Sequence, residues 1–242
     1  MSEANLQDRN VGNLGDILKH AALLQLAKIF AEQVTEKKYY LDSHSYLYQS
    51  QLANPAWQEQ TQALLSQSAL YQDYLQTQSP YIVRSEYLCS SGLVNSILPE
   101  AHLLLSEVNR TTRDCLLQQL VENKVDAYTL KEQILHWPGD LPVKRLPNLL
   151  ALIDPFELTE ELWQSVGFTL SKILSNNASA IMLVFDYTHQ ADKAWPLAPK
   201  GWVGPLASIS PLPYKLAVYS SAGFVRPVQR QLAKMGWCSS GR

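Results

Sequence analysis

Four short apolar segments of this chain each contain or lead into a carboxylate, and helical periodicity separates them. The segments are residues 39–42, 102–107, 125–128 and 149–153, and their carboxylates are Asp42, Glu107, Asp126 and Asp154. Before, between and after them, apolar residues recur at the i+3 and i+4 spacing of helices, most clearly over residues 16–30, 110–121 and 158–174. Strands that alternate with helices pair in parallel. The pattern therefore predicts an α/β fold in which helices flank one mostly parallel sheet.

The domain organisation follows from the absence of repeats and of low-complexity linkers. A chain of 242 residues without such boundaries is expected to form a single domain over residues 1–242. The Gln-rich residues 54–77 predict a small helical insertion outside the central sheet, closed by Ser79-Pro80. We expect its deletion to cost less stability than truncation of Leu162 or Val166, which the periodicity assigns to the core.

Composition excludes several classes of protein. No run approaches the ~18 apolar residues of a membrane span, and the first ten residues lack the apolar core of a signal peptide. Three cysteines, Cys89, Cys115 and Cys238, are too few and too scattered for a disulfide framework or a metal cluster. We expect a cytoplasmic globular protein without a membrane or metal site.

Positive charge is concentrated in the last quarter of the chain. Residues 189–242 contain seven Lys and Arg against one acidic residue, a balance of +6 in a chain whose net charge is −2. Aromatic residues lie between these cations, as on surfaces that bind single-stranded nucleic acid. This segment is either an RNA-binding surface or a solvated edge whose aromatic residues anchor the core.

In a parallel sheet, ligands bind outside the carboxyl ends of the strands. Carboxylates at those ends can hold a ribose diol and an adenine amino group, so the four acids together favour a nucleoside cofactor. Each one alone is also a common turn former.

Three motifs resemble one known family. They are Gly12-Asn13-Leu14-Gly15-Asp16-Ile17-Leu18-Lys19-His20, Leu41-Asp42-Ser43-His44 and Leu152-Ile153-Asp154-Pro155-Phe156-Glu157. In order and spacing they resemble the GNxxDxLKH, LDTH and LIDPPYE segments of the bacterial 23S rRNA adenine-N6 methyltransferases (large-subunit methyltransferase J). The resemblance covers most of the chain and implies the Rossmann-like class I fold of S-adenosylmethionine-dependent methyltransferases.

The resemblance also implies roles for single residues. Asp42 and His44 would border the methionine end of the S-adenosylmethionine cofactor, Glu107 would hold its ribose and Asp126 its adenine. Asp154, Pro155 and Phe156 would take a flipped target adenine, with Phe156 stacking on the base, and Lys19 would reach the same pocket. For His44 a hydrogen-bonded structural role, and for Lys19 a solvated helix face, remain alternatives.

The sequence departs from the family at the cofactor loop and at the target site. Where the family has AGAG, this chain has Ser45-Tyr46-Leu47-Tyr48, and glycines there let the backbone approach the cofactor. Asp154-Pro155-Phe156 is one proline shorter than DPPY. We therefore expect a divergent relative, a pseudoenzyme with reduced or lost methyl transfer and a retained binding role. The alternative is an active N6-adenine methyltransferase that acts on RNA.

Overall fold

The central sheet has seven strands. The computed structural model describes residues 11–65, 68–130, 146–154, 179–186, 202–203 and 215–235. The strands of this sheet are β1 (Tyr39–Asp42), β4 (His102–Ser106), β5 (Ala127–Leu130), β6 (Asn148–Ile153), β7 (Ser179–Asp186), β8 (Trp202–Val203) and β9 (Lys215–Ser221). Their order is β5-β4-β1-β6-β7-β9-β8.

Strand direction and order define the fold class. The five strands from β5 to β7 are parallel, and β9 runs antiparallel to β7 and β8. This is a Rossmann-like, mostly parallel sheet flanked by helices, so the predicted α/β fold class is confirmed. The predicted strands at residues 39–42, 102–107 and 149–153 lie in this sheet as parallel neighbours, because Tyr39 is in register with both His102 and Leu149.

Both faces of the sheet centre are covered. Every residue of β6 is buried, and residues 180–185 of β7 are buried as well. Continuous apolar strands of this kind are typical of parallel sheets with both faces packed. The core thus lies around β1, β6 and β7, and their carboxyl ends form the edge at which the candidate site is built.

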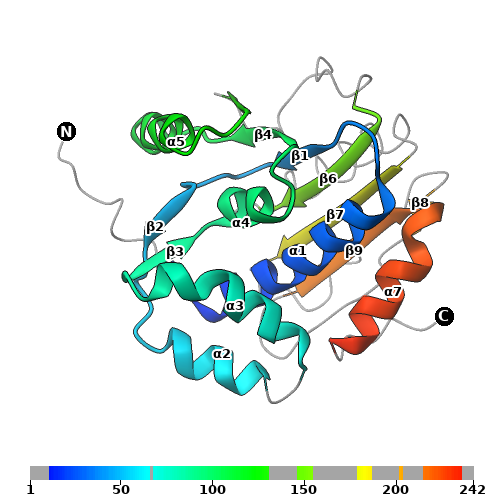
Figure 1. The fold of residues 1–242 in the computed structure, drawn as a ribbon, viewed down its shortest axis with the longest axis horizontal. Helices are drawn as coiled ribbons and strands as arrows, with labels where there is room; N and C mark the ends of the chain where they lie inside the picture. The colour runs from blue at the N-terminus through cyan, green and yellow to red at the C-terminus, as the bar shows by residue number, and fades with distance from the viewer. Residues whose placement is uncertain are drawn as a thin grey trace.

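Helices α4, α1 and α7 lie in front of the sheet in Figure 1. Helix α1 (Leu14–Gln33) covers the predicted helix 16–30, α4 spans Ser90–Ile97, α5 spans Arg110–Glu122, and α7 spans Val225–Lys234 after the short 3-10 helix η3 (Ala222–Phe224). On α7, Val228 and Leu232 point into the core, and the Phe30 and Phe224 rings stack with centroids 5.9 Å apart. These contacts hold α7 beside α1.

The segment between β1 and α4 leaves the sheet. It contains β2 (Gln49–Gln51), α2 (Trp57–Leu65), α3 (Leu70–Ile82) and β3 (Glu86–Leu88), and β2 and β3 pair in a separate antiparallel sheet. Helices α2 and α3 thus occupy the segment expected to be helical, but the predicted stop at Ser79-Pro80 is wrong. Pro80 lies inside α3, near its end, and the helical bond that follows joins Val83 N to Ser79 O at 3.2 Å.

Among the described residues, no helix is both long and apolar enough to cross a membrane, and no group of three metal-ligating side chains is present. The predicted helix at 158–174, with Leu162 and Val166, lies outside the described residues.

Candidate functional site

Residues 12–20, the first of the three motifs, form the start of helix α1. Gly12 has a left-handed φ of +81°, a conformation that favours glycine. Asn13 is the N-cap of α1, and its Oδ1 accepts a hydrogen bond from Asp16 N at 3.0 Å. Asp16 Oδ2 in turn accepts a hydrogen bond from Gly12 N at 2.9 Å. These contacts fix the direction in which the first turn of α1 presents Lys19.

Lys19 joins α1 to the end of β6. Its Nζ lies 3.0 Å from Asp16 Oδ1 and 2.5 Å from Asp154 Oδ2, and 5.5 Å from the centre of the Phe185 ring. Lys19 is only 4% exposed, so the alternative of a solvated helix face is wrong. A buried ammonium requires this kind of pairing, because an unpaired charge in the interior is strongly disfavoured.

Asp42, at the end of β1, is fully buried. Its carboxylate accepts hydrogen bonds from Ser90 Oγ at 2.5 Å, Tyr40 Oη at 3.1 Å and His44 N at 3.2 Å. Burial raises the pKa of Asp42 to about 6, and the nearby Asp154 charge adds to this rise. Asp42 therefore binds a proton more readily than an exposed aspartate, and its carboxylate is hydrogen-bonded to donors within the protein.

Ser43 connects the ends of β1 and β6. Its Oγ lies 2.7 Å from His44 Nδ1 and accepts a hydrogen bond from Asp154 N at 3.1 Å, while Ser43 N donates to Leu152 O at 3.0 Å. His44 is thus hydrogen-bonded within the protein, in agreement with the structural alternative. Lys19, Asp42, His44 and Asp154 come together here, where the strand order reverses between β1 and β6 and where α/β sheets bind ligands.

The loop that replaces the glycines is packed into the protein. Ser45, Leu47 and Tyr48 are buried, and the Tyr48 hydroxyl accepts a hydrogen bond from Asn95 Nδ2 at 3.2 Å. None of residues 43–48 has a positive φ. The tyrosines therefore cause no left-handed strain, because the loop follows a path that any residue can adopt.

Four backbone amides of this loop donate hydrogen bonds within the protein. His44 N donates to Asp42, Ser45 N donates to Ser106 O at 2.8 Å, and Gln119 Oε1 accepts from both Tyr48 N and Gln49 N. Gly92 of α4 lies so close that an added Cβ would be 2.5 Å from Tyr48 O. The loop is thus held between β4, α4 and α5.

Glu107 follows β4, at the predicted carboxyl edge. It is 5% exposed, and its Oε1 accepts a hydrogen bond from Asn109 N at 2.7 Å. This places a carboxylate beside Ser106, the residue whose carbonyl accepts from the loop after β1.

Asp126 does not belong to this site, and its predicted place at a carboxyl strand end is wrong. It precedes β5, and its carboxylate pairs at 2.5 Å with His102 Nδ1, the first residue of β4. Both residues lie at the amino edge of the sheet, opposite the site. Pro155 and Phe156 lie outside the described residues.

Two contacts of the site were not predicted. Ser90 reaches Asp42 from a position 48 residues later, and Tyr40 reaches it from the same strand. The only sequence signal for Ser90 is a Ser-Ser-Gly run before a helical pattern, which predicts a helix start and gives no indication of Asp42.

No protein-family model and no curated protein matches the sequence. The structure is similar to that of protein LPL1258 from Legionella pneumophila, with a TM-score of 0.62 and 16% identity over 93% of each chain. This likeness concerns the fold.

Methyltransferase structures are also among its neighbours. An rRNA methylase from Streptococcus thermophilus has a TM-score of 0.47 at 9% identity, over 81% of this chain and 93% of that one. TrmN from Thermus thermophilus has a TM-score of 0.42 at 14% identity, over 55% of this chain and 41% of that one.

Proposed function

We propose that this protein is a methyltransferase-like RNA-binding protein in which methyl transfer from S-adenosylmethionine is reduced or lost. The observation that carries the proposal is the packing of residues 43–49, where a methyltransferase of the resembled family has its glycine loop. The divergence of this protein from that family thus lies in its cofactor site.

The two ends of the implied cofactor fit these residues differently. For the ribose end, Glu107 offers a carboxylate at the end of β4, and Ser45 Oγ nearby is buried without a hydrogen-bond partner among the described residues. For the methionine end, the amides of His44, Ser45 and Tyr48 already donate within the protein, and Asp42 accepts three internal hydrogen bonds. A charged amino-acid group would have to displace these bonds, which favours weak or absent cofactor binding.

The target end is also engaged. In the resembled family, the aspartate of the target motif accepts a hydrogen bond from the amino group to be methylated. Here Asp154 Oδ2 lies 2.5 Å from Lys19 Nζ, so a substrate amine would compete with a buried ammonium for this oxygen. Lys19 therefore orients Asp154 and engages Oδ2, the oxygen for which a substrate amine would compete.

An active N6-adenine methyltransferase acting on RNA is the second candidate. It is favoured by the convergence of Lys19, Asp42 and Asp154 at the switch point of a methyltransferase sheet. In that case Asp154, with Pro155 and Phe156, would hold the target base.

Calorimetric titration with S-adenosylmethionine and with S-adenosylhomocysteine separates the two candidates. We expect no saturable heat at micromolar concentrations of either compound. Micromolar or tighter binding that weakens in Glu107→Gln, but not in the exposed control Glu122→Gln, would overturn the proposal. Transfer of labelled methyl groups to RNA by the native protein, abolished in Asp154→Asn, would establish the second candidate.

A further inference from the structure

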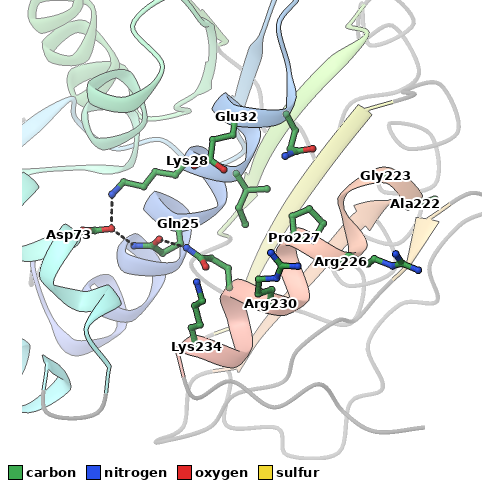
Figure 2. A pocket seen from close by; sticks show the side chains of 13 residues that line it. Gln25, Lys28, Glu32, Asp73, Ala222, Gly223, Arg226, Pro227, Arg230 and Lys234 are labelled. Carbon is green, nitrogen blue, oxygen red and sulfur yellow. Dashed lines mark hydrogen bonds and ion pairs between the residues drawn. The ribbon is translucent and has the colours of Figure 1, made fainter.

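A polar groove lies between α7 on one side and α1 with the start of α3 on the other (Figure 2). Its volume is about 740 Å³. The groove is separate from the Lys19–Asp154 site, because its α1 residues begin at Gln25 and continue to Gln33, toward the other end of the helix.

Contacts between its walls fix the shape of the groove. Gln231 Nε2 of α7 donates to Gln25 Oε1 of α1 at 3.1 Å, and Lys28 Nζ of α1 lies 2.6 Å from Asp73 Oδ2 of α3. At the end of α7, Ser68 Oγ donates to Lys234 O at 2.8 Å. Figure 2 shows the first two of these contacts, which join α1 to α3 and to α7.

Three cations form a stripe along the groove wall. Arg226, Arg230 and Lys234 follow one another at intervals of four residues, which is about 6 Å along a helix. All three are exposed, on the side of α7 opposite its buried residues Val228 and Leu232. Among the described residues, none of the three forms an ion pair with a carboxylate.

This stripe lowers the stability of its own helix. Like charges four residues apart on a helix repel each other. Arg226 also lies in the first turn of α7, where the helix dipole disfavours a cation. A partner of opposite charge would offset both effects.

We propose that the groove between α1 and α7 binds the phosphate backbone of an RNA strand, with Arg226, Arg230 and Lys234 as the phosphate contacts. Four cations line the groove against two carboxylates, and one of these carboxylates, Asp73, is already paired with Lys28. The spacing of the stripe is comparable with that of successive phosphates along a strand. The choice of RNA as the polyanion rests on the proposed function, but the groove requires no cofactor.

Binding of a fluorescent single-stranded RNA at several salt concentrations tests this site. Each phosphate contact contributes about −0.7 to the slope of log K against log salt for single strands. In the triple variant Arg226→Gln, Arg230→Gln, Lys234→Gln, we expect weaker binding at low salt and a slope smaller in magnitude by about 2. Glutamine keeps the helix propensity of these exposed positions close to that of the cations.

A matched control removes three exposed cations elsewhere, in Arg84→Gln, Arg110→Gln, Lys124→Gln, and should keep the wild-type slope. The charge-preserving variant Arg226→Lys, Arg230→Lys should also keep it. Equal slopes in the two triple variants, or no RNA binding by the native protein at low salt, would overturn the proposal. The proposal would also be overturned if the triple variant lost binding to phosphatidylserine vesicles but kept its RNA binding. Equal slopes in the two triple variants overturn the groove alone, whereas absent RNA binding by the native protein overturns the proposed RNA-binding function as well, so the two failures are distinguishable.

Discussion

At the scale of single residues, Asp42 is expected to make the protein less stable as pH rises. Burial raises its pKa to about 6 in the folded chain, against 3.8 for the unfolded group. Between about pH 4 and pH 6 the unfolded state loses this proton before the folded state, so stability declines across that interval by up to about 3 kcal/mol. In denaturant unfolding, the unfolding free energy of the wild type minus that of Asp42→Asn should decline by this amount across the interval, because the contribution of His20 is the same in both proteins. Parallel pH profiles would contradict the assignment, and the exposed Asp114→Asn is the control.

His20, the neighbour of Lys19, acts in the opposite direction. Burial, together with the charge of Lys19, lowers the pKa of His20 to about 3, and Nδ1 lies 2.7 Å from Tyr87 Oη. The stability that neutral His20 contributes is present above pH 6.5 and is lost as pH falls toward 3, by about 3–5 kcal/mol. His20→Gln should flatten the acid limb of the unfolding free energy. If the unfolding free energy falls as steeply at acidic pH in His20→Gln as in the control His102→Gln, His20 is not the cause of that fall.

At the scale of elements, the approach of α4 to the loop after β1 leaves no room for a side chain at Gly92. Its Cβ would lie 2.5 Å from Tyr48 O, a backbone atom, whereas a Cβ at Gly223 of η3 would meet nothing within 4 Å. Gly92→Ala should cost roughly 1–3 kcal/mol of unfolding free energy by overpacking. Gly223→Ala should be neutral or stabilising by a few tenths of a kcal/mol, because it restricts the unfolded chain. Equal unfolding midpoints for the two variants would show that α4 can move away from the loop.

The same elements show how far sequence reasoning reaches. Strands β1, β4 and β6 are predictable because a short apolar run before a carboxylate has few other interpretations in a chain where such runs alternate with helical patterns. Asp126 is misplaced because residues 125–128 are too short for periodicity to fix a boundary. With β5 beginning at Ala127, this carboxylate lies at the amino edge. Tyr46 and Tyr48 predict strain only if the loop keeps a glycine conformation, and the loop path depends on β4, α4 and Gln119, which are distant in sequence.

At the scale of the whole molecule, α1 connects every part described above. Its first turns carry Lys19 and His20, and its later turns carry Gln25 and Lys28 into the groove. From His20, hydrogen bonds of 2.7 Å run to Tyr87 of β3 and on to Tyr74 of α3. The groove and the carboxyl-edge site therefore share helix α1, while each has its own side chains.

The helices between β1 and α4 should accordingly unfold together with the sheet. Trp57 of α2 is 1% exposed and packs with Tyr74, their ring centroids 6.1 Å apart, in the same cluster as α1. Trp57→Ala should lower the unfolding free energy of a single transition by about 3–5 kcal/mol, whereas the exposed neighbour Gln58→Ala should stay within about 0.5 kcal/mol of the wild type. Far-ultraviolet circular dichroism across a denaturant series measures both. If Trp57→Ala instead produces an early partial transition and leaves the main midpoint unchanged, residues 54–77 form an independently stable subdomain that the core does not require.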